Sequence, residues 1–306
     1  MASPPIGVQR DYPLARLTTI RTGGPAELFA RAGSLKELEL LLAWAADEQL
    51  EVGVVGSGSN LLVADTGVRG LVLKLDDELS KIEIDETRIE CGGGARLPSV
   101  SARAAQAGLA GIEFGVNIPG TVGGAVRMNA NAYGGQLARV LEWVDVVDRS
   151  GTSRRAPGEL GFEYRRSNLV PGEIVARASF ALERASSDEV KATLADMRAR
   201  RKAAQPSGIK TFGSTFKNPD DPRAEGRTAG QLLEEAGCRG LRIGGASFSA
   251  KHANFIVNHG DATTADVIAL MAEGRRRVHE RFAVKLEAEV QRLGPVELPA
   301  DWTEAE

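Results

Sequence analysis

The stretch from Gly111 to Gly135 constrains the fold most strongly, because it mixes many glycines with side chains typical of a protein core. The glycines alternate with residues such as Phe114, Val122 and Met128, for which a flexible linker has no use. Glycine among buried residues indicates that the backbone approaches another group closely or takes a positive φ. Turns of this kind leave N–H groups pointing one way, in a nest that suits a phosphate. A tight crossover between strands is the alternative explanation.

A second glycine cluster lies in the segment 53–65 (GVVGSGSNLLVAD), where residues 56–60 interrupt two apolar runs. This cluster does not fit the dinucleotide fingerprint of a Rossmann fold, because Leu61 stands where a further glycine or alanine is needed. The loop also leads into another apolar run instead of a helix. Two candidate phosphate cradles in one chain suggest a single pyrophosphate-bearing ligand held between two pieces of structure.

Charge and composition exclude several classes of protein. The formal net charge of −3 lacks the basic excess of a nucleic-acid-binding protein, and no apolar run is long enough to span a membrane. Two cysteines without CxxC spacing, and an amino terminus without a signal-peptide pattern, indicate a reduced and cytoplasmic protein. The histidines show no metal-ligand spacing. We therefore expect no metal, no nucleic acid, no membrane and no obligate protein partner.

Hydrophobic periodicity predicts two lobes of mixed α and β structure before residue 206. In the first lobe, a helix over 34–50 begins with a capping box of Ser34 and Glu37, and strands follow at 52–55 and 71–75. The second lobe is expected to contain a mostly antiparallel sheet. Its predicted elements are a hairpin over 82–89, a helix at 98–107, strands at 140–148 and 174–182, and a basic helix at 188–205 with a solvated face.

A domain boundary is predicted at 205–208, where Gln-Pro-Ser-Gly breaks the chain. The part that follows has a compact polar turn at 211–219 (TFGSTFKNP) and two helices that begin with capping pairs. Alternating apolar and polar residues over 284–290 predict a final strand. The capping pairs are Thr228 with Gln231 and Thr263 with Asp266.

These motifs together resemble the UDP-N-acetylenolpyruvoylglucosamine reductase family, whose members are flavoenzymes of peptidoglycan precursor synthesis. The resemblance covers nearly the whole chain. The short glycine motifs alone would fit any flavoprotein of the broad vanillyl-alcohol-oxidase type. The GSTFKNP turn and the carboxylate of Glu289 make the resemblance specific to this family. It is carried in order by Gly23-Gly24-Pro25-Ala26, Gly56-Ser57-Gly58-Ser59-Asn60-Leu61, IPGTVGGA from Ile118 to Ala125, Tyr164-Arg165 with Ser167, Gly213-Ser214 with Phe216-Lys217-Asn218-Pro219, and Leu286-Glu287 with Glu289-Val290.

The resemblance implies an α+β protein with a two-lobed FAD-binding domain of the vanillyl-alcohol-oxidase type, followed by a smaller α+β substrate-binding domain. We expect the FAD domain over 1–205, with lobes of about 1–76 and 77–205, and the substrate domain over 206–306. The short connection after Leu182 leaves no room for the extra tyrosine-bearing loop of the longer subgroup. Asn117 and Asn131 stand where the family usually has glycine, so we expect both in the left-handed region that asparagine tolerates.

The resemblance also implies the reaction and the residues that carry it. NADPH would reduce non-covalently bound FAD, and the flavin would pass a hydride to C3 of UDP-N-acetylglucosamine enolpyruvate. Arg165 would stabilise the enolate, Ser214 would protonate C2, Glu289 would orient this acid, and Tyr164 would position the substrate. The implied cofactor-binding residues are Arg21, Gly56, Ser57, Gly58, Ser59, Asn60, Leu61, Ile118, Pro119, Gly120, Thr121, Gly123, Gly124 and Ala125. The candidates for holding the diphosphate and uridine are Lys217, Asn218, Arg242, Lys251 and His252.

Two other functions fit part of the sequence. An oxygen-using carbohydrate or phenol oxidase could share the flavin fold, but such enzymes frequently tether FAD through histidine or cysteine. This chain has no histidine before His252, and Cys91 is the one cysteine in the flavin lobes. A non-catalytic nucleotide-binding regulator would explain the glycine loops, although it has no need for Arg165, Ser214 and Glu289 together.

Overall fold

The computed structural model describes residues 4–299 and 302, and this part of the chain forms two compact units. The first unit contains the described residues up to Asp11, then Glu27–Ser57 and Arg69–Arg201. The second contains Tyr12–Ala26, Gly58–Val68 and the described residues from Lys202 onward. Two early segments of the chain therefore belong to the same unit as the carboxy-terminal part.

The first sheet combines parallel pairing with a covering helix, as expected for a β-α-β unit. Its strand order is β1-β2-β5-β3, and β3 runs parallel to β5 with Val54 opposite Leu73. Helix α1 begins after Ser34, whose hydroxyl accepts from the N–H of Glu37 at 3.2 Å, so the predicted cap at Ser34 is confirmed. The capping box is incomplete, because the Glu37 carboxylate accepts from the N–H of Gly33 at 2.8 Å and not from that of Ser34. The elements are β1 (Gln9–Pro13), β2 (Pro25–Ala32), α1 (Leu35–Asp47), β3 (Val52–Val54) and β5 (Val68–Leu75).

The larger sheet of the first unit has the order β12-β11-β13-β7-β6, and every neighbouring pair is antiparallel, as the sequence predicted. Helices α2 and α3 contribute to the apolar core of this sheet. Helix α4 buries only Val190 and Leu194, which agrees with a solvated basic face. The elements are β6 (Ile82–Asp85), β7 (Arg88–Gly92), α2 (Leu97–Gln106), α3 (Val122–Arg127), β11 (Leu141–Asp148), β12 (Gly151–Arg155), β13 (Ile174–Ala181) and α4 (Ser187–Ala204).

Two short antiparallel pairs complete the first unit. The β8 strand pairs with β14, and β9 pairs with β10 across a two-residue turn at Tyr133 and Gly134. Both turn residues have positive φ, as this hairpin turn requires. The strands are β8 (Leu109–Ala110), β9 (Asn131–Ala132), β10 (Gly135–Gln136) and β14 (Glu183–Arg184).

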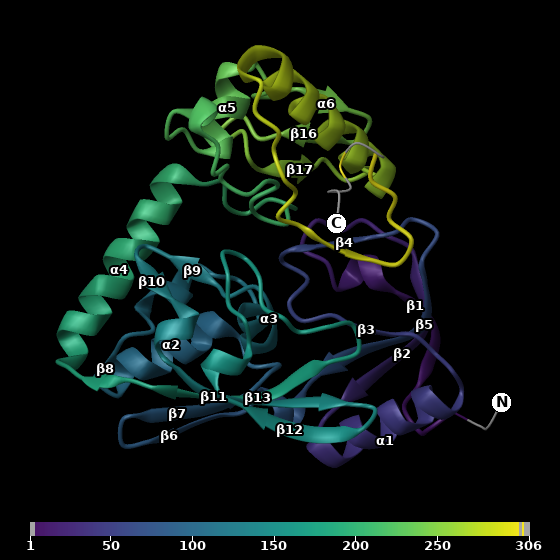
Figure 1. Cartoon of the computed structure of the whole chain (residues 1–306), viewed down its shortest axis with the longest axis vertical. Helices are drawn as coiled ribbons and strands as arrows, with labels where there is room; N and C mark the ends of the chain where they lie inside the picture. The colour runs from purple at the N-terminus through teal and green to yellow at the C-terminus, as the bar shows by residue number, and fades with distance from the viewer. Residues whose placement is uncertain (1–3, 300–301, 303–306) are drawn as a thin grey trace. The chain divides into compact units, whose positions relative to one another are not determined.

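The second unit is built on an antiparallel three-stranded sheet, β15-β16-β17, with helices α5 and α6 packed against it (Figure 1). Phe248 of β16 and Leu270 of α6 are fully buried in this core. A separate parallel pair joins β4 to β18. The elements are β4 (Leu61–Val63), α5 (Ala229–Glu235), β15 (Arg242–Ile243), β16 (Ala246–Phe248), β17 (Ile256–Asn258), α6 (Thr264–Phe282) and β18 (Gln291–Leu293).

The predicted strand over 284–290 is wrong. The segment makes one isolated bridge, Phe216 with Ala288, and the regular strand begins only at Gln291. Two backbone hydrogen bonds hold the segment against the turn at 211–219, from Lys217 N–H to the Glu287 carbonyl and from Glu289 N–H to the Thr215 carbonyl, both 2.9 Å. Its alternating burial therefore comes from packing against a turn and not from a β ladder.

The expected left-handed backbone at Asn117 and Asn131 is also wrong. Asn117 ends a 3-10 turn, and its side-chain amide donates to the Met197 carbonyl at 2.8 Å. Asn131 lies in extended conformation in β9. Among the non-glycine residues of this region, Asn129 and Tyr133 have positive φ instead.

In the part of the chain that the structure describes, no helix combines the length and the apolar character needed to cross a membrane. Likewise, no group of three or more His, Cys, Asp and Glu residues within 4–299 and 302 is arranged to hold a metal ion.

Candidate active site

The first glycine loop, residues 56–60, joins β3 to β4. Gly58 has a φ of +61°, and a Cβ atom there would overlap the carbonyl of Leu17, so only glycine fits. Its own carbonyl accepts from the N–H of Thr19 at 3.0 Å. The backbone N–H groups of residues 56–60 donate no hydrogen bond to any residue that the structure describes. The loop is thus a set of open donors on a fixed backbone, as a phosphate nest requires.

The second glycine loop, residues 120–124, is used partly for packing, so only some of its N–H groups can belong to the predicted nest. Val122 donates to the Ala95 carbonyl at 2.9 Å, and Gly123 donates to the Gly93 carbonyl at 2.8 Å. A Cβ on Gly123 would lie 3.1 Å from that same Gly93 oxygen. Within the described residues, the N–H groups of Gly120 and Thr121 have no acceptor and are the open donors of this loop.

Gly56 of the first glycine loop lies against Thr121 of the second loop inside the first unit. A Cβ atom on Gly56 would lie 2.5 Å from Oγ1 of Thr121, so the glycine permits a direct approach of the two backbones. Open N–H donors therefore stand on both sides of one junction. This arrangement fits the diphosphate of FAD, because backbone donors on a rigid frame recognise phosphate oxygens without needing side chains.

Arg165 lies in a tight turn of the first unit. Its φ is +58°, in the left-handed region that non-glycine residues rarely adopt. Its guanidinium donates to the Asn131 carbonyl at 3.3 Å and lies 5.1 Å from the ring centre of Tyr164, a residue that is 46% exposed. The turn is held by Asn129, whose amide donates to the Glu163 carbonyl at 3.0 Å. An unusual backbone conformation held by the structure around it is typical of a functional residue.

Ser214 and Glu289 lie on adjacent segments of the second unit. The residue after Ser214, Thr215, accepts the N–H of Glu289 at 2.9 Å, and Ser214 itself bridges to Phe255. The side chain of Asn60 donates to the Glu289 carbonyl at 3.2 Å. The structure therefore brings together a residue of the first glycine loop, the predicted acid and the predicted carboxylate.

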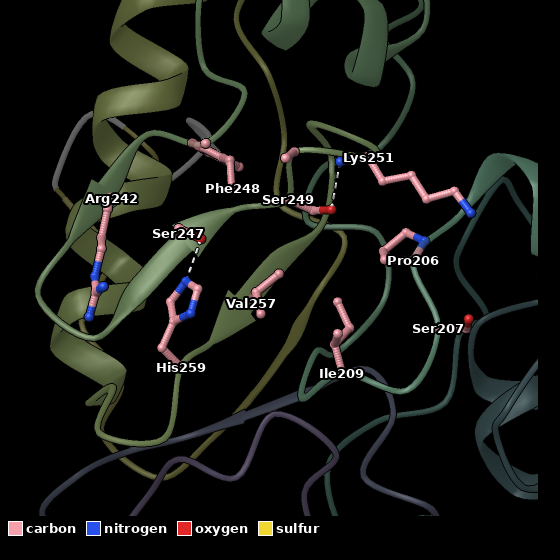
Figure 2. Close-up of a pocket in the computed structure, with 12 residues that line it drawn as sticks. Pro206, Ser207, Ile209, Arg242, Ser247, Phe248, Ser249, Lys251, Val257 and His259 are labelled. Carbon is pink, nitrogen blue, oxygen red and sulfur yellow. Dashed lines mark hydrogen bonds between the residues drawn. The ribbon is translucent and has the colours of Figure 1, made fainter.

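A pocket of about 610 Å³ opens on the second unit and contains two of the predicted substrate-binding residues, Arg242 and Lys251 (Figure 2). Among the described residues, no carboxylate lines it. Lys251 donates through Nζ to the Lys202 carbonyl at 2.6 Å, and Arg242 donates to the Gly244 carbonyl at 2.9 Å. The remaining polar lining comes from hydroxyl groups and an imidazole, which include a Ser247–His259 hydrogen bond of 2.8 Å. Such a lining suits an anion.

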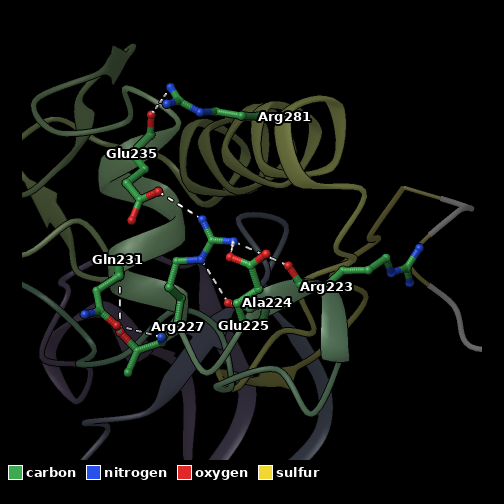
Figure 3. A network of polar contacts seen from close by, with 8 residues as sticks. Arg223, Ala224, Glu225, Arg227, Gln231, Glu235 and Arg281 are labelled. Atoms are coloured by element: carbon green, nitrogen blue, oxygen red, sulfur yellow. Dashed lines mark hydrogen bonds and ion pairs between the residues drawn. The ribbon is translucent and has the colours of Figure 1, made fainter.

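Asn218 lies at the start of α5 and not in this pocket. Its side-chain oxygen accepts the N–H of Ala229 at 3.1 Å, in the same turn as the capping box of Thr228 and Gln231. Arg227 holds the turn through ion pairs with Glu225 and Glu235 at 3.0 and 3.1 Å (Figure 3). Asn218 thus has a clear structural role, and its contact with substrate stays a prediction.

Lys217 and His252 also lie apart from the pocket. Lys217 forms an ion pair of 3.1 Å with Glu287. The His252 ring packs edge-on against Phe255, and its Nδ1 accepts the N–H of Asn254 at 3.2 Å. Burial lowers the pKa of His252, so the ring adds no positive charge at neutral pH.

The remaining predicted cofactor-binding residues lie in or next to the two glycine loops, except for Arg21. Arg21 has a φ of +66° and donates to the Arg16 carbonyl in the second unit. Ile118 and Pro119 lead into the second glycine loop, and Ala125 is buried within α3. Ser57, Ser59 and Gly124 belong to the two loops, and Leu61 begins β4.

Comparison with known proteins gives concordant matches along the chain. The pattern described as "FAD binding domain" matches residues 26–156, and that of "UDP-N-acetylenolpyruvoylglucosamine reductase, C-terminal domain" matches residues 205–293. UDP-N-acetylenolpyruvoylglucosamine reductase 2 of Symbiobacterium thermophilum is 44% identical over 94% of this chain and 92% of its own. The chain belongs to the UDP-N-acetylenolpyruvoylglucosamine reductase family.

Further family members agree. The UDP-N-acetylenolpyruvoylglucosamine reductase of Novosphingobium aromaticivorans is 45% identical over 93% of this chain and 94% of its own. The crystal structure of the reductase from Thermus caldophilus superposes with a TM-score of 0.81 at 38% identity, covering 94% of this chain and 98% of that one. These matches confirm the family resemblance and the predicted α+β fold, with an FAD-binding domain followed by a separate carboxy-terminal domain.

Sequence reasoning missed two residues of the first unit that contact segments predicted to be functional. Tyr133 forms the tip of the β9–β10 hairpin, and its hydroxyl oxygen lies 3.2 Å from the amide nitrogen of Asn117. Lys74 projects from β5 to the carbonyl of Gly56 at 2.7 Å. Lys74 stands in an apolar run that indicates only a strand. Tyr133 stands next to glycines that indicate only a turn, so neither pattern predicts a functional side chain.

Proposed function

We propose that Arg165, Ser214 and Glu289 carry the reaction that defines this family. The enzyme reduces UDP-N-acetylenolpyruvoylglucosamine to UDP-N-acetylmuramate, with FAD as its cofactor and NADPH as the hydride donor. The observation that best supports the residue assignment is the backbone bond from Glu289 N–H to the Thr215 carbonyl. This bond supports the assignment because it holds the backbone of Glu289 against the residue that follows Ser214.

The two glycine loops would hold the FAD diphosphate through the open N–H groups of residues 56–60, Gly120 and Thr121. When bound, FAD takes a hydride from NADPH and passes it to C3 of the enolpyruvyl group. We propose that the cofactor is held without a covalent bond. Cys91, the cysteine of the first unit, is buried, and burial raises its pKa far above the usual range, so the thiolate needed for a tether is not available.

Arg165 would stabilise the charge that develops on the substrate. Hydride addition at C3 leaves an electron pair at C2, which spreads into the neighbouring carboxylate as an enolate. A guanidinium offers planar, permanently charged donors that match a carboxylate, and preorganised donors are most effective where charge develops. The left-handed backbone of Arg165 and the hydrogen bond from its guanidinium to the Asn131 carbonyl restrict the orientation of the guanidinium. Tyr164, beside the guanidinium, would help to position the substrate.

Ser214 would complete the reaction by donating its hydroxyl proton to C2, which forms the C–H bond and consumes the enolate. A serine hydroxyl is a weak acid, so the proton must be replaced from its surroundings as it leaves. Glu289, fixed beside it, would orient the hydroxyl and the group that returns the proton. The net addition is one hydride at C3 and one proton at C2.

The basic pocket is our candidate for the anionic part of the nucleotide sugar. Arg242 and Lys251 supply its positive charge, and its hydroxyl groups supply neutral donors. Lys217, Asn218 and His252 lie outside it, so their assignment to the substrate rests on the motif and on sequence proximity alone. We propose FAD-binding and substrate-binding domains over 1–205 and 206–306, a cytoplasmic location and no need for a protein, nucleic-acid or membrane partner.

The purified protein tests this function directly. It should be yellow, release FAD on denaturation, lose its visible absorbance with NADPH and regain it when UDP-N-acetylenolpyruvoylglucosamine is added without oxygen. UDP-N-acetylmuramate should form in equal amount. A colourless protein that takes up no added FAD would contradict the proposal, and so would reoxidation by oxygen but not by the enolpyruvyl substrate. The latter result would favour an oxidase.

A further inference from the structure

Lys74 is a charged residue in an otherwise apolar strand. Strand β5 reads VRGLVLKL, and Leu71, Leu73 and Leu75 pack into the core that contains α1. Because side chains alternate along a strand, Lys74 faces the other side of the sheet, where it is half-buried. Burying a lysine is unfavourable unless its charge is compensated. A functional reason for the charge is therefore worth seeking.

The recorded polar partner of Lys74 is a neutral group. Its ammonium donates to the carbonyl of Gly56 at 2.7 Å, and no carboxylate in the described part of the chain forms an ion pair with it. The nearby Asp76 is bound to Arg31 at 2.6 Å. An ammonium has three N–H donors, and the Gly56 carbonyl occupies one of them.

The positive charges around Lys74 make its surroundings favourable for an anion. The pKa of Lys74 is lowered chiefly by burial, and further by the positive charges of Arg31 and Arg96, while Asp76 acts in the opposite direction. Arg96 likewise has no ion pair among the residues that the structure describes. A bound anion would relieve both the repulsion between these cations and the unfavourable burial of Lys74.

Lys74 reaches the junction of the glycine loops with its side chain, and the backbone of Arg96 lies beside the same junction. Lys74 binds the carbonyl of Gly56, which lies against Thr121, and Arg96 forms an antiparallel bridge with Thr121. The open N–H groups of both loops lie along the same backbone segments. Dipoles alone are weak partners for a doubly charged group, whereas an ammonium adds a full opposite charge.

We propose that Lys74 is a diphosphate-binding residue for FAD, which it contacts while holding the Gly56 loop in place, and that Arg96 adds a second positive charge to the same site. The inference rests on the use of FAD by this family, and it concerns affinity for the cofactor and not the hydride or proton transfers. Loss of Lys74 removes a charge-assisted hydrogen bond to the cofactor. Loss of such a bond weakens binding about 10- to 100-fold.

The test compares cofactor affinity with the stability of the FAD-free protein. FAD-free wild type, Lys74→Met, Lys74→Arg and the control Lys81→Met are titrated with FAD, and the quenching of flavin fluorescence gives each dissociation constant. Lys81 is exposed and lies just beyond β5 in the same unit. The thermal midpoint of each protein is measured with and without FAD.

We expect Lys74→Met to raise the FAD dissociation constant about 10- to 100-fold and Lys74→Arg to restore most of the affinity. Lys81→Met should stay within a factor of about two. The FAD-free midpoint of Lys74→Met should be unchanged or higher, because a partly desolvated charge has been removed. Unchanged affinity in Lys74→Met, or an equal loss of midpoint with and without FAD, would overturn the inference. Failure of the wild type to bind FAD would instead overturn the proposed function.

Discussion

The backbone N–H of Glu289 donates a 2.9 Å hydrogen bond to the carbonyl oxygen of Thr215. Thr215 follows Ser214, so this bond holds the backbone of Glu289 against the segment that carries the proposed acid. The side chain of Asn60 adds a second constraint through its 3.2 Å bond to the Glu289 carbonyl. Neither bond involves the side chain of Ser214, so a change of side chain at this position should leave the arrangement intact.

The contact between the two glycine loops predicts a specific effect of Gly56→Ala. The added methyl would lie 2.5 Å from the Thr121 hydroxyl, which also accepts the N–H of Gly124, so that the loops must separate. We expect FAD affinity to fall at least 10-fold and stability to fall by about 1–3 kcal/mol, as for other overpacked sites. Gly158→Ala is the matched control, since no atom lies within 4 Å of its added methyl and its φ is not positive. Fluorescence titration with FAD should separate the two variants, and equal affinities would show that the loops need no close contact.

The two glycine loops also show how far sequence reasoning reaches. Gly56 and Thr121 were predicted to serve one ligand because glycine-rich turns next to core residues have few explanations, and the structure brings them together. The internal bonds of Val122 and Gly123 were not predictable, because their acceptors, Ala95 and Gly93, come from another part of the chain. A local sequence pattern predicts the local backbone conformation. Hydrogen-bond partners that are distant in the sequence are determined by the tertiary fold and cannot be predicted from that pattern.

Asn117 illustrates the same limit and yields a second prediction. Its expected left-handed backbone followed from residue preference, but its true role is tertiary, since its amide donates to the Met197 carbonyl at 2.8 Å. Asn117→Ala should therefore lower the free energy of unfolding by about 1–2 kcal/mol. The control Asn131→Ala removes a half-exposed side chain without a recorded hydrogen bond and should change it far less. Denaturant unfolding measures both, and similar losses would contradict the assignment.

The acid stability of the second unit should depend on Glu273 in α6. Hydrogen bonds from Arg276, and then from Arg277, lower the pKa of Glu273 to about 2. A carboxylate whose pKa is lowered by folding stabilises the folded state at pH values above its pKa in the unfolded chain, which is near 4.5. This contribution is lost as the pH falls from about 4.5 towards 2.

Glu273→Gln should consequently be less stable than wild type at neutral pH and should lose less stability over that acid range. Thermal midpoints at several pH values measure the difference. Glu83→Gln, an exposed carboxylate on β6 without an ion pair among the described residues, should follow the wild-type curve. An identical pH dependence for Glu273→Gln and wild type would show that the arginine pairs contribute nothing.

The role of Ser214 can be isolated because the two half-reactions make different demands on it. Reduction of FAD by NADPH needs no proton at C2 of the enolpyruvyl substrate, whereas reoxidation by that substrate does. The neighbouring Thr215 offers a matched control, since its hydroxyl is fully buried and has no hydrogen-bond partner within the described residues. Thr215→Val removes this hydroxyl while keeping the shape of the side chain, so both half-reactions should proceed at close to wild-type rates.

Stopped-flow measurement of both half-reactions in Ser214→Ala is the most direct test of the proposed mechanism. We predict that NADPH reduces the flavin at close to the wild-type rate, while reoxidation by UDP-N-acetylenolpyruvoylglucosamine slows by about 10²–10⁴-fold, as expected for loss of a positioned general acid. Cysteine at position 214 should recover part of the lost rate. If Ser214→Ala slows flavin reduction as much as reoxidation, or leaves reoxidation at the rate of Thr215→Val, Ser214 is not the acid.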